Sequence, residues 1–286
     1  MAGSFLDPQE RTVTLGNVFV QDQVALTDAL TLTVGLKYET NSFSGEEILP
    51  NVRLAWRPAN GDLYWGAVSR ASRTPNRIER DLRAAGLLTG GDFQSELLTA
   101  YELGYRSNPT PNTAVSVSAF YNEYESLRTV RPAPVTIVPF AFANDAEGRT
   151  YGMEAWGSWD VRPRWRLSAG VSTLDKDFAV KPGQIALSGL AAIGDDPNYQ
   201  VLLRSQADLA EDVELDVRLR AVDELDQSGL DAYVEADARV GWQVTEDVEL
   251  AVAGQNLLDD HKLETADPQR RRAFGRAVYA QLRWGF

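Results

Sequence analysis

The single histidine of the chain, His261, follows two carboxylates, Asp259 and Asp260. An imidazole beside carboxylates could bind a metal ion or work as an acid–base pair. A zinc site needs three or four converging ligands, and a serine nucleophile would have to lie beside this histidine, which the sequence does not indicate. The chain has no cysteine, and it lacks the P-loop, GxSxG and HExxH patterns. We therefore expect a solvated loop histidine, no enzyme, and no catalytic, cofactor-binding or metal-binding residues.

A segment rich in arginine offers a second chemical possibility. Asn76, followed three residues later by Glu79, has the spacing of a helix capping box, which predicts a short helix over about residues 77–85. That helix would place Arg77 and Arg80 on neighbouring turns of one face. Such a basic stripe could attract an anionic ligand, or the arginines could pair with nearby carboxylates or with lipopolysaccharide phosphates. The candidate ligand-attracting residues are Arg73, Arg77, Arg80 and Arg83.

The overall charge limits the partners that such basic clusters can have. The chain holds 41 acidic and 28 basic residues, for a net charge of −13, so it is a poor candidate for binding nucleic acid. A second basic run, Arg270 to Arg272, lies in the last predicted loop. We interpret it as contacting lipopolysaccharide or solvent in preference to a substrate.

The elements that must position these residues are strands. Between Glu214 and Val222, and again between Tyr233 and Trp242, every second residue is apolar, which is the period of a β-strand. About thirteen such strands can be counted, many of about 10 residues, whereas strands of soluble proteins usually run about 5–6 residues and bilayer-crossing strands about 9–11. No run of about 18 apolar residues exists to form a transmembrane helix. Strand length therefore favours an all-β protein that crosses a membrane.

Charged residues share one face of these strands. Arg218 and Arg220 are expected to lie beside Glu235, Asp237 and Arg239 of the next strand, where opposite charges can pair across strands. Charges on one face and apolar residues on the other suit a hydrated lumen and a lipid-facing exterior. The pairs would then hold the wall together, although they could also line a path for a solute.

The predicted connections alternate in length along the chain. Short turns, such as residues 59–62 and 210–212, alternate with longer loops over about residues 72–97, 129–143, 178–195 and 258–272. Outer-membrane barrels have this pattern, with short turns at one rim and long loops at the other. All seven tryptophans fall on predicted strands or strand ends, as membrane-interface girdles would require.

The last predicted strand of the chain has Leu282, Trp284 and Phe286 on one face. The last strand of bacterial barrels ends in an aromatic residue and closes the ring, so these three residues are the candidate barrel-assembly strand. An ordinary edge strand is the alternative.

Four further segments fit one family in order and spacing: residues 65–82 with SRASRTPNRIE, 93–105 with SELLTAYELGY, 120–124 followed by 150–154, and 253–259 with GQNLLD. Together with Phe286 they resemble the C-terminal barrel of TonB-dependent outer-membrane receptors, over about residues 12–286. One departure is His261-Lys262-Leu263-Glu264, where relatives often carry His-x-Glu-Phe. Because of this departure, the role of that run in relatives is not assigned to this chain.

The resemblance implies an antiparallel transmembrane β-barrel of about 22 strands, of which this chain would supply the C-terminal thirteen or so. Residues 1–286 would form one partial receptor-like barrel domain. The first residues carry neither a basic nor an apolar signal-peptide region, and we expect the signal peptide, the plug domain, the TonB box and about nine N-terminal strands to be absent.

The resemblance also implies function and partners. Such a receptor of the Gram-negative outer membrane binds a scarce ligand at its outer loops, with a ferric siderophore as the default, and imports it with energy from the TonB complex. Its other partners would be the barrel assembly machinery and lipopolysaccharide or other outer-membrane lipid. Two alternatives remain: a smaller passive porin, channel or outer-membrane hydrolase, and a soluble β-sandwich binding module.

Overall fold

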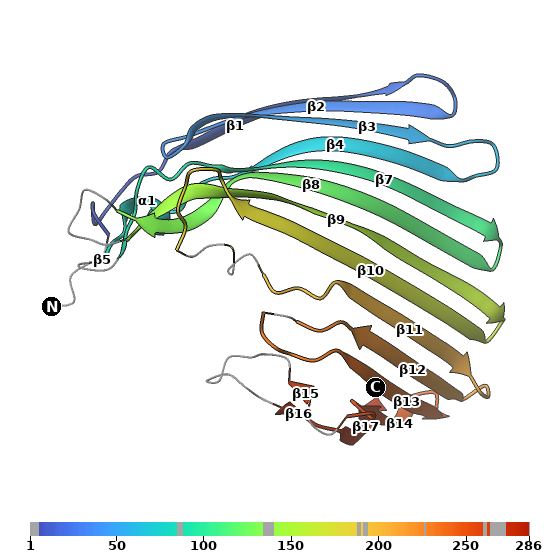
Figure 1. Cartoon of the computed structure of the whole chain (residues 1–286). Coiled ribbons are helices and arrows are strands. Elements are labelled where there is room, and N and C mark those ends of the chain that lie inside the picture. Colours follow the sequence, from blue (N-terminus) through green and yellow to red (C-terminus); the bar gives the residue numbers. More distant parts are fainter. Residues whose placement is uncertain are drawn as a thin grey trace. The chain divides into compact units, whose positions relative to one another are not determined.

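The computed structural model describes residues 6–84, 88–133, 140–187, 190, 194–225, 227–259, 262–263 and 273–285. Thirteen long strands of the described residues follow one another in a single antiparallel order (Figure 1). They are β1 (Leu15–Ala25), β2 (Leu30–Asn41), β3 (Gly45–Trp56), β4 (Leu63–Arg73), β7 (Glu96–Thr110), β8 (Thr113–Pro132), β9 (Phe140–Arg162), β10 (Trp165–Val180), β11 (Tyr199–Asp208), β12 (Val213–Val222), β13 (Tyr233–Thr245), β14 (Val248–Gln255) and β17 (Ala277–Trp284). The expected fold class and number of long strands are confirmed.

Short elements lie between these strands. The helix α1 (Arg77–Asp81) and the strands β5 (Arg83–Ala84) and β6 (Leu88–Thr89) all belong to the connection from β4 to β7. The strand β6 pairs with β5 and also runs parallel to the start of β9. A separate pair, β15 (Lys262–Leu263) and β16 (Ala273–Phe274), belongs to the connection from β14 to β17. No described helix is long and apolar enough to span a bilayer.

From β4 onward the connections alternate in length as expected. Two residues join β7 to β8 and β9 to β10, and two join β13 to β14, whereas the connections after β4, β10, β12 and β14 are long. The turn between β3 and β4 places Gly61 at φ +85°, a conformation that glycine adopts without the cost other residues incur. Because each strand reverses direction, the long loops all fall at one end of the strands, which also carries the three-residue turn from β2 to β3.

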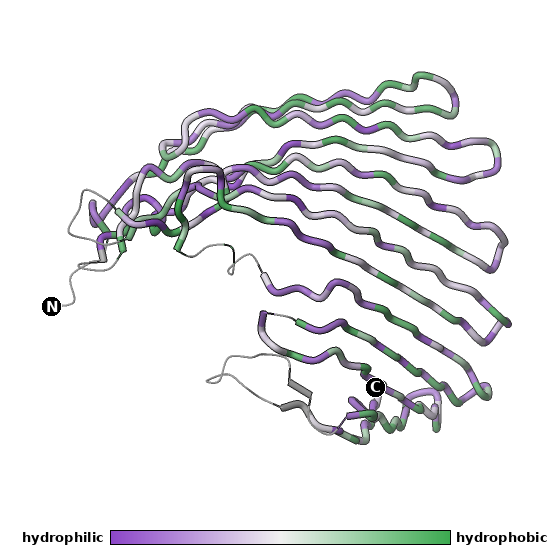
Figure 2. Tube along the Cα trace, in the orientation of Figure 1, coloured by the Kyte–Doolittle hydropathy of each residue, from purple (hydrophilic) through white to green (hydrophobic). Residues whose placement is uncertain are grey.

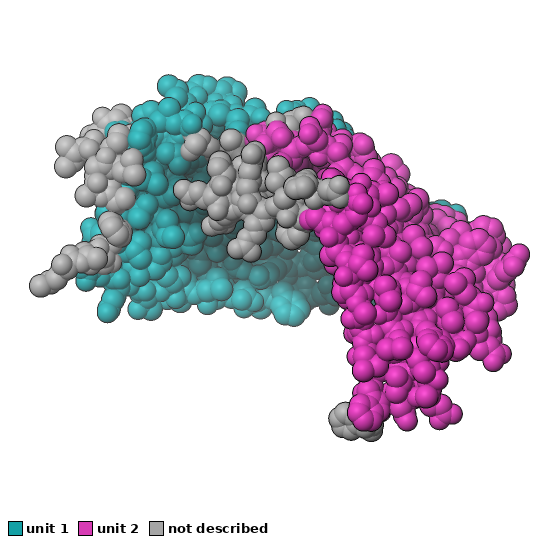
Figure 3. Space-filling view, turned by 90° about the horizontal axis from the view of Figure 1, so that it is seen from below, with its two compact units in different colours: residues 1–104, 119–151, 175–194 teal, residues 105–118, 152–174, 195–286 magenta. Residues whose placement is uncertain are grey.

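The chain divides into two compact units, coloured separately in Figure 3. Unit 1 comprises residues 1–104, 119–151 and 175–194, and unit 2 comprises residues 105–118, 152–174 and 195–286.

Hydrophobic and hydrophilic residues alternate along many of the strands (Figure 2), and because successive side chains point to opposite faces, each unit has one apolar and one polar strand face. In unit 1, Val34 lies opposite Val52 across β2 and β3, and both side chains are exposed. In unit 2, Val240 and Val252 make the same kind of exposed apolar pair across β13 and β14. A continuous apolar face without protein cover matches a surface that contacts lipid, and we call it the outward face.

The polar face of unit 2 carries the expected cross-strand pairs. Arg218 lies opposite Asp237 across β12 and β13, and its Nε is 3.0 Å from a carboxylate oxygen of that residue. Arg239 reaches the carboxylates of Glu214, at 3.5 Å, and Glu249. Exposed pairs of this kind contribute at most about 1 kcal/mol each. The expectation that Arg218 and Arg220 lie beside the acidic residues of the next strand is confirmed, because Arg218 is opposite Asp237 and Arg220 is opposite Glu235.

Candidate functional site: the loop cluster around Glu79

The connection from β4 to β7 folds around α1, whose first turn is the capping box expected from the sequence. The Asn76 side chain accepts a hydrogen bond from the backbone N–H of Glu79 at 3.0 Å. The Glu79 carboxylate in turn accepts the backbone N–H of Asn76 at 2.9 Å. The helix is shorter than the expected 77–85, because Leu82 takes an extended conformation and forms a β-bridge with Leu6.

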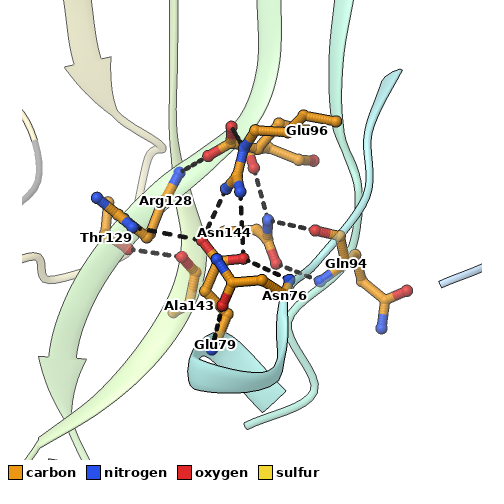
Figure 4. Close-up of polar contacts among 10 residues, drawn as sticks. Asn76, Glu79, Gln94, Glu96, Arg128, Thr129, Ala143 and Asn144 are labelled. Carbon is orange, nitrogen blue, oxygen red and sulfur yellow. Dashed lines mark hydrogen bonds and ion pairs between the residues drawn. The ribbon is translucent and has the colours of Figure 1, made fainter. Parts of the chain in front are cut away.

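Glu79 lies at the centre of an ion-pair network, and its side chain is only 1% exposed. Its carboxylate is 2.8 Å from Nη2 of Arg73 and 3.4 Å from Nη1 of Arg128 on β8. Arg73 also reaches Glu96 at 2.5 Å, and the backbone N–H of Arg128 donates to the same Glu96 carboxylate at 2.7 Å. Two carboxylates and two arginines therefore connect the loop to the ends of β4, β7 and β8 (Figure 4).

The environment of Glu79 favours its charged form. Burial by itself raises the pKa of a carboxyl. The hydrogen bonds from Arg73 and from the backbone of Asn76, with the charge of Arg128, outweigh burial and hold the pKa of Glu79 below its ordinary value. The loop is thus held by an ionised buried carboxylate.

Asp81 is the last residue of α1, and it binds residues of the segment that precedes β1. Its side chain is 2% exposed and lies 2.9 Å from Nη2 of Arg11 and 3.1 Å from Nε of Arg77. Arg77 also donates to the backbone carbonyls of Pro8 and Gln9. The backbone N–H of Asp7 donates to the Asp81 carbonyl at 2.9 Å.

A pair of glycines lets the loop fold back on α1. A Cβ at Gly90 would lie 2.5 Å from the backbone carbon and oxygen of Arg80. The N–H of Gly91 donates to the Glu79 carbonyl at 3.1 Å. Arg80 donates to the carbonyl of Phe93 at 3.0 Å, and the Phe93 side chain is fully buried.

Asn144 of β9 holds the end of the same loop through hydrogen bonds to Gln94. Its side-chain oxygen accepts the N–H of Gln94 at 2.7 Å. Its side-chain nitrogen donates to the carbonyls of Gln94 at 3.1 Å and Ser126 at 2.6 Å. Ser126 has φ +61°, so β8 departs from regular strand geometry where it meets Asn144. One amide side chain thus satisfies three backbone groups, two of Gln94 and one of Ser126.

A pocket of about 610 Å³, lined by both polar and apolar residues, lies beside the cluster in unit 1. Gly90 and Gly91 form part of its lining, together with Gln94, Arg131 and Asp145. Arg131 is half exposed and only loosely paired with Asp145, at 3.4 Å. The cavity can therefore offer a guanidinium and amide groups to a bound molecule. In the described part of the chain, no three His, Asp or Glu side chains are grouped closely enough to hold a metal ion.

The four candidate arginines are all used within the loop cluster. Arg73 and Arg77 pair with Glu79 and Asp81. Arg80 binds the Phe93 carbonyl, and Arg83 donates to Thr89 at 3.0 Å and to the Leu82 carbonyl. They do not form one basic stripe, because the loop folds back and each guanidinium meets a different partner. Whether any of them attracts a ligand stays a prediction.

Other predicted residues lie elsewhere. Leu282 and Trp284 are exposed on β17. His261, the run Arg270 to Arg272, and Phe286 lie outside the described residues.

Sequence reasoning missed Arg128, Glu96 and Asn144. Arg128 lies 49 residues from its partner Glu79, and Asn144 lies 50 from Gln94. Residues this far apart in the sequence form no recognisable local motif, and they meet only because of the register in which the strands pair.

Solved structures with a similar fold are siderophore and iron transport proteins. A ferric enterobactin receptor (PfeA) variant from Pseudomonas aeruginosa superposes with a TM-score of 0.76 at 16% identity, over 96% of this chain and 45% of that one. The siderophore receptor PirA from Acinetobacter baumannii gives 0.74 at 16% identity, over 96% and 46%. The FrpB iron transporter from Neisseria meningitidis gives 0.77 at 16% identity, over 95% and 45%. At this identity the likeness shows the fold.

One curated relative is similar in sequence. The iron-regulated outer membrane virulence protein of Vibrio cholerae serotype O1 is 27% identical over 171 residues, which are 53% of this chain and 26% of that protein. The chain thus spans about a quarter of this relative and less than half of the solved receptors. The family model described as "TonB dependent receptor-like, beta-barrel" matches residues 2–257. The chain therefore belongs to the TonB-dependent receptor-like β-barrel family, a family of receptors in the Gram-negative outer membrane.

Proposed function

We propose that this chain is part of an outer-membrane receptor that binds a ferric siderophore at its long-loop end and imports it with energy from TonB. Family membership supports receptor function. The structural neighbours named as siderophore receptors and the iron-regulated relative support an iron chelate as the ligand class. Energised import would also require the plug and TonB-binding segments of a complete receptor.

The observation that carries the proposal is the pocket of mixed polar and apolar lining beside a loop held by ion pairs. Ligand sites of small molecules usually have volumes of about 300–1,000 Å³, and this cavity has about 610 Å³. The buried carboxylates of Glu79 and Asp81 hold the adjoining loop in place before any ligand arrives. A preformed site of this kind loses less conformational entropy on binding.

Arg131 is the residue proposed to contact the ligand. Its guanidinium is half exposed and contacts the buried Asp145 carboxylate through Nη1 alone, so its other N–H donors can bind an anionic chelate while this ion pair stays in place. Arg73, Arg77, Arg80 and Arg83 would add positive potential at the loop end while they hold the loop. Leu282 and Trp284 of β17, with Phe286, remain the proposed contact for the barrel assembly machinery.

The test is siderophore binding and uptake in cells that express the protein as their sole receptor of this type. Binding of a ⁵⁵Fe-loaded siderophore in de-energised cells should fall about tenfold in Arg131→Gln, the loss expected for one charge-assisted hydrogen bond. The matched control is Arg166→Gln, which removes an exposed arginine paired with Asp160 beside a short turn and should leave binding unchanged. Uptake, but not binding, should stop when TonB is deleted. Uptake that continues without TonB would overturn the proposal in favour of a passive channel.

A further inference from the structure

Asp22 of β1 lies on the outward face of unit 1, where the neighbouring side chains are apolar. In the strand register Asp22 is opposite Val34 of β2, and Val34 is opposite Val52 of β3. Residues that are directly opposite across antiparallel strands share one face of the sheet, and both valines lie on the outward face. Asp22 therefore carries a carboxylate on the side of the sheet that contacts lipid.

The position of Asp22 along β1 places this carboxylate well inside the apolar band. The outward positions on either side of it are Val20 and Val24, and both are exposed. Asp22 is five residues from Thr27 in the turn to β2, which is about 16 Å along the strand and, with a strand tilt of about 40°, about 12 Å of depth. Because the apolar band of a transmembrane barrel is about 25 Å tall, Asp22 lies near its middle.

A carboxylate at this depth needs a partner. Ionisable side chains inside a membrane almost always pair with another group, because hydrocarbon cannot solvate a charge. One oxygen of Asp22 accepts the backbone N–H of Gln23 at 2.9 Å. In the described part of the chain, no arginine or lysine lies within ion-pair distance of this carboxylate. The described residues therefore leave its negative charge without a counter-charge.

The outer edge of β1 also needs a partner. Among the described residues β1 pairs with β2 alone and stands at one end of the strand order. Backbone N–H and C=O groups along an open edge cannot bond to hydrocarbon. A further antiparallel strand along this edge would pair with them, and every second side chain of that strand would lie on the outward face beside Asp22.

We propose that the strand which pairs with the outer edge of β1 carries an arginine or lysine on its outward face, and that this side chain forms a salt bridge with Asp22 inside the membrane. Opposite side chains on one face have Cβ atoms about 4.5–5.5 Å apart, and diagonal ones about 7–8 Å, which a long cationic side chain can span. A charge-assisted hydrogen bond would compensate both charges.

Such a pair would also determine how the two strands align. A slip of the register by one residue would turn the cation to the opposite face of the sheet and leave Asp22 alone in lipid. The salt bridge would therefore favour one register between β1 and its partner strand. The inference rests on the membrane location of the chain and not on siderophore import.

The first experiment measures the temperature at which the barrel unfolds in isolated outer membranes, for protein expressed from its complete gene. If Asp22 has a cationic partner, Asp22→Leu leaves that cation uncompensated and should lower the unfolding temperature by about 2–4 °C. If Asp22 faces lipid, the same substitution removes a poorly solvated charge, so an equal or higher temperature would overturn the proposal. The matched control is Val34→Leu, directly opposite on β2, which should have little effect.

The second experiment identifies the partner. A photo-reactive amino acid replaces Asp22 in one variant and Val34 in another, and the products are analysed by mass spectrometry after irradiation of intact cells. Position 22 should cross-link to a peptide of the same polypeptide that lies outside residues 1–286 and contains an arginine or lysine. Position 34 should cross-link mainly to lipid. Cross-linking of position 22 to lipid alone, or to a separate protein, would contradict the proposed strand.

Exchanging the two charges tests the salt bridge directly. Asp22→Arg should lower the unfolding temperature, and so should aspartate in place of the identified cation, because each change puts two like charges side by side. The two substitutions together should restore most of the lost temperature. If they add without restoration, the two side chains do not form a salt bridge. These readouts do not involve a siderophore, so they stand whether or not the protein imports one.

Discussion

Glu79 of α1 and Arg128 of β8 are 49 residues apart in sequence, yet the Glu79 carboxylate and Nη1 of Arg128 lie 3.4 Å apart. Arg73 reaches the same carboxylate from β4. One buried glutamate therefore joins a loop helix to two strands that are not neighbours in the sheet order. The shape of the loop end depends on this carboxylate remaining charged.

Replacing Glu79 by glutamine should loosen the loop. The neutral amide can still accept the Asn76 N–H, but the Arg128 guanidinium loses its charged partner and Arg73 keeps only Glu96. Because those arginines are nearly half exposed, we expect a cost of about 1–2 kcal/mol, below that of a fully buried pair. Limited proteolysis of the protein in detergent should cut the loop faster. Glu125→Gln, which affects only an exposed pair, is the control. Equal cleavage in E79Q and wild type would contradict the assigned role.

Low pH should have the same effect as E79Q. The pKa of Glu79 is lowered in the folded state, so its stabilisation is complete above the ordinary value of 4.5 and is lost as pH falls through the lowered pKa. The chain has no cysteine, so Ile78→Cys, an exposed helix position, can carry a single spin label. Its mobility should rise on acidification below pH 4.5. In an E79Q background this change in mobility should disappear. If it persists, another titratable group causes it.

Gly90 is required for the close approach of the loop to α1. In Gly90→Ala the new Cβ would meet the backbone of Arg80 at 2.5 Å, and backbone cannot move aside as a flexible side chain can. Overpacking of this kind costs about 1–3 kcal/mol. Siderophore binding should weaken with it, because Gly90 lines the cavity. Gly16→Ala, whose Cβ would make only an ordinary 3.5 Å contact with Thr40, should be neutral. Wild-type binding in Gly90→Ala would show that the loop does not shape the cavity.

The sequence was sufficient for the strands and for local contacts. Period-two patterns predicted the long strands, and the Asn76–Glu79 spacing predicted the capping box, because both signals lie within a few residues. The pairing of Arg218 with Asp237 followed from two consecutive strands joined by one loop. The loop cluster could not be predicted, since it depends on Leu82 leaving the helix to pair with Leu6 and on the register that brings Asn144 to Gln94. A run of arginines likewise does not reveal that each one has its own internal partner.

The polar face of unit 1 contains a packing constraint that can be tested by rescue. A Cβ at Gly104 on β7 would lie 2.2 Å from the Trp65 indole on β4, and the Arg53 guanidinium lies 5.3 Å from the centre of the same ring. The indole is held between a glycine and a cation, so Gly104→Ala should displace it and lower stability by about 1–3 kcal/mol. The measurement is the temperature at which the protein in detergent unfolds. Adding Trp65→Leu to Gly104→Ala should recover part of that loss, because the smaller side chain leaves room for the methyl group. If the two substitutions add without any recovery, the methyl group does not act through Trp65.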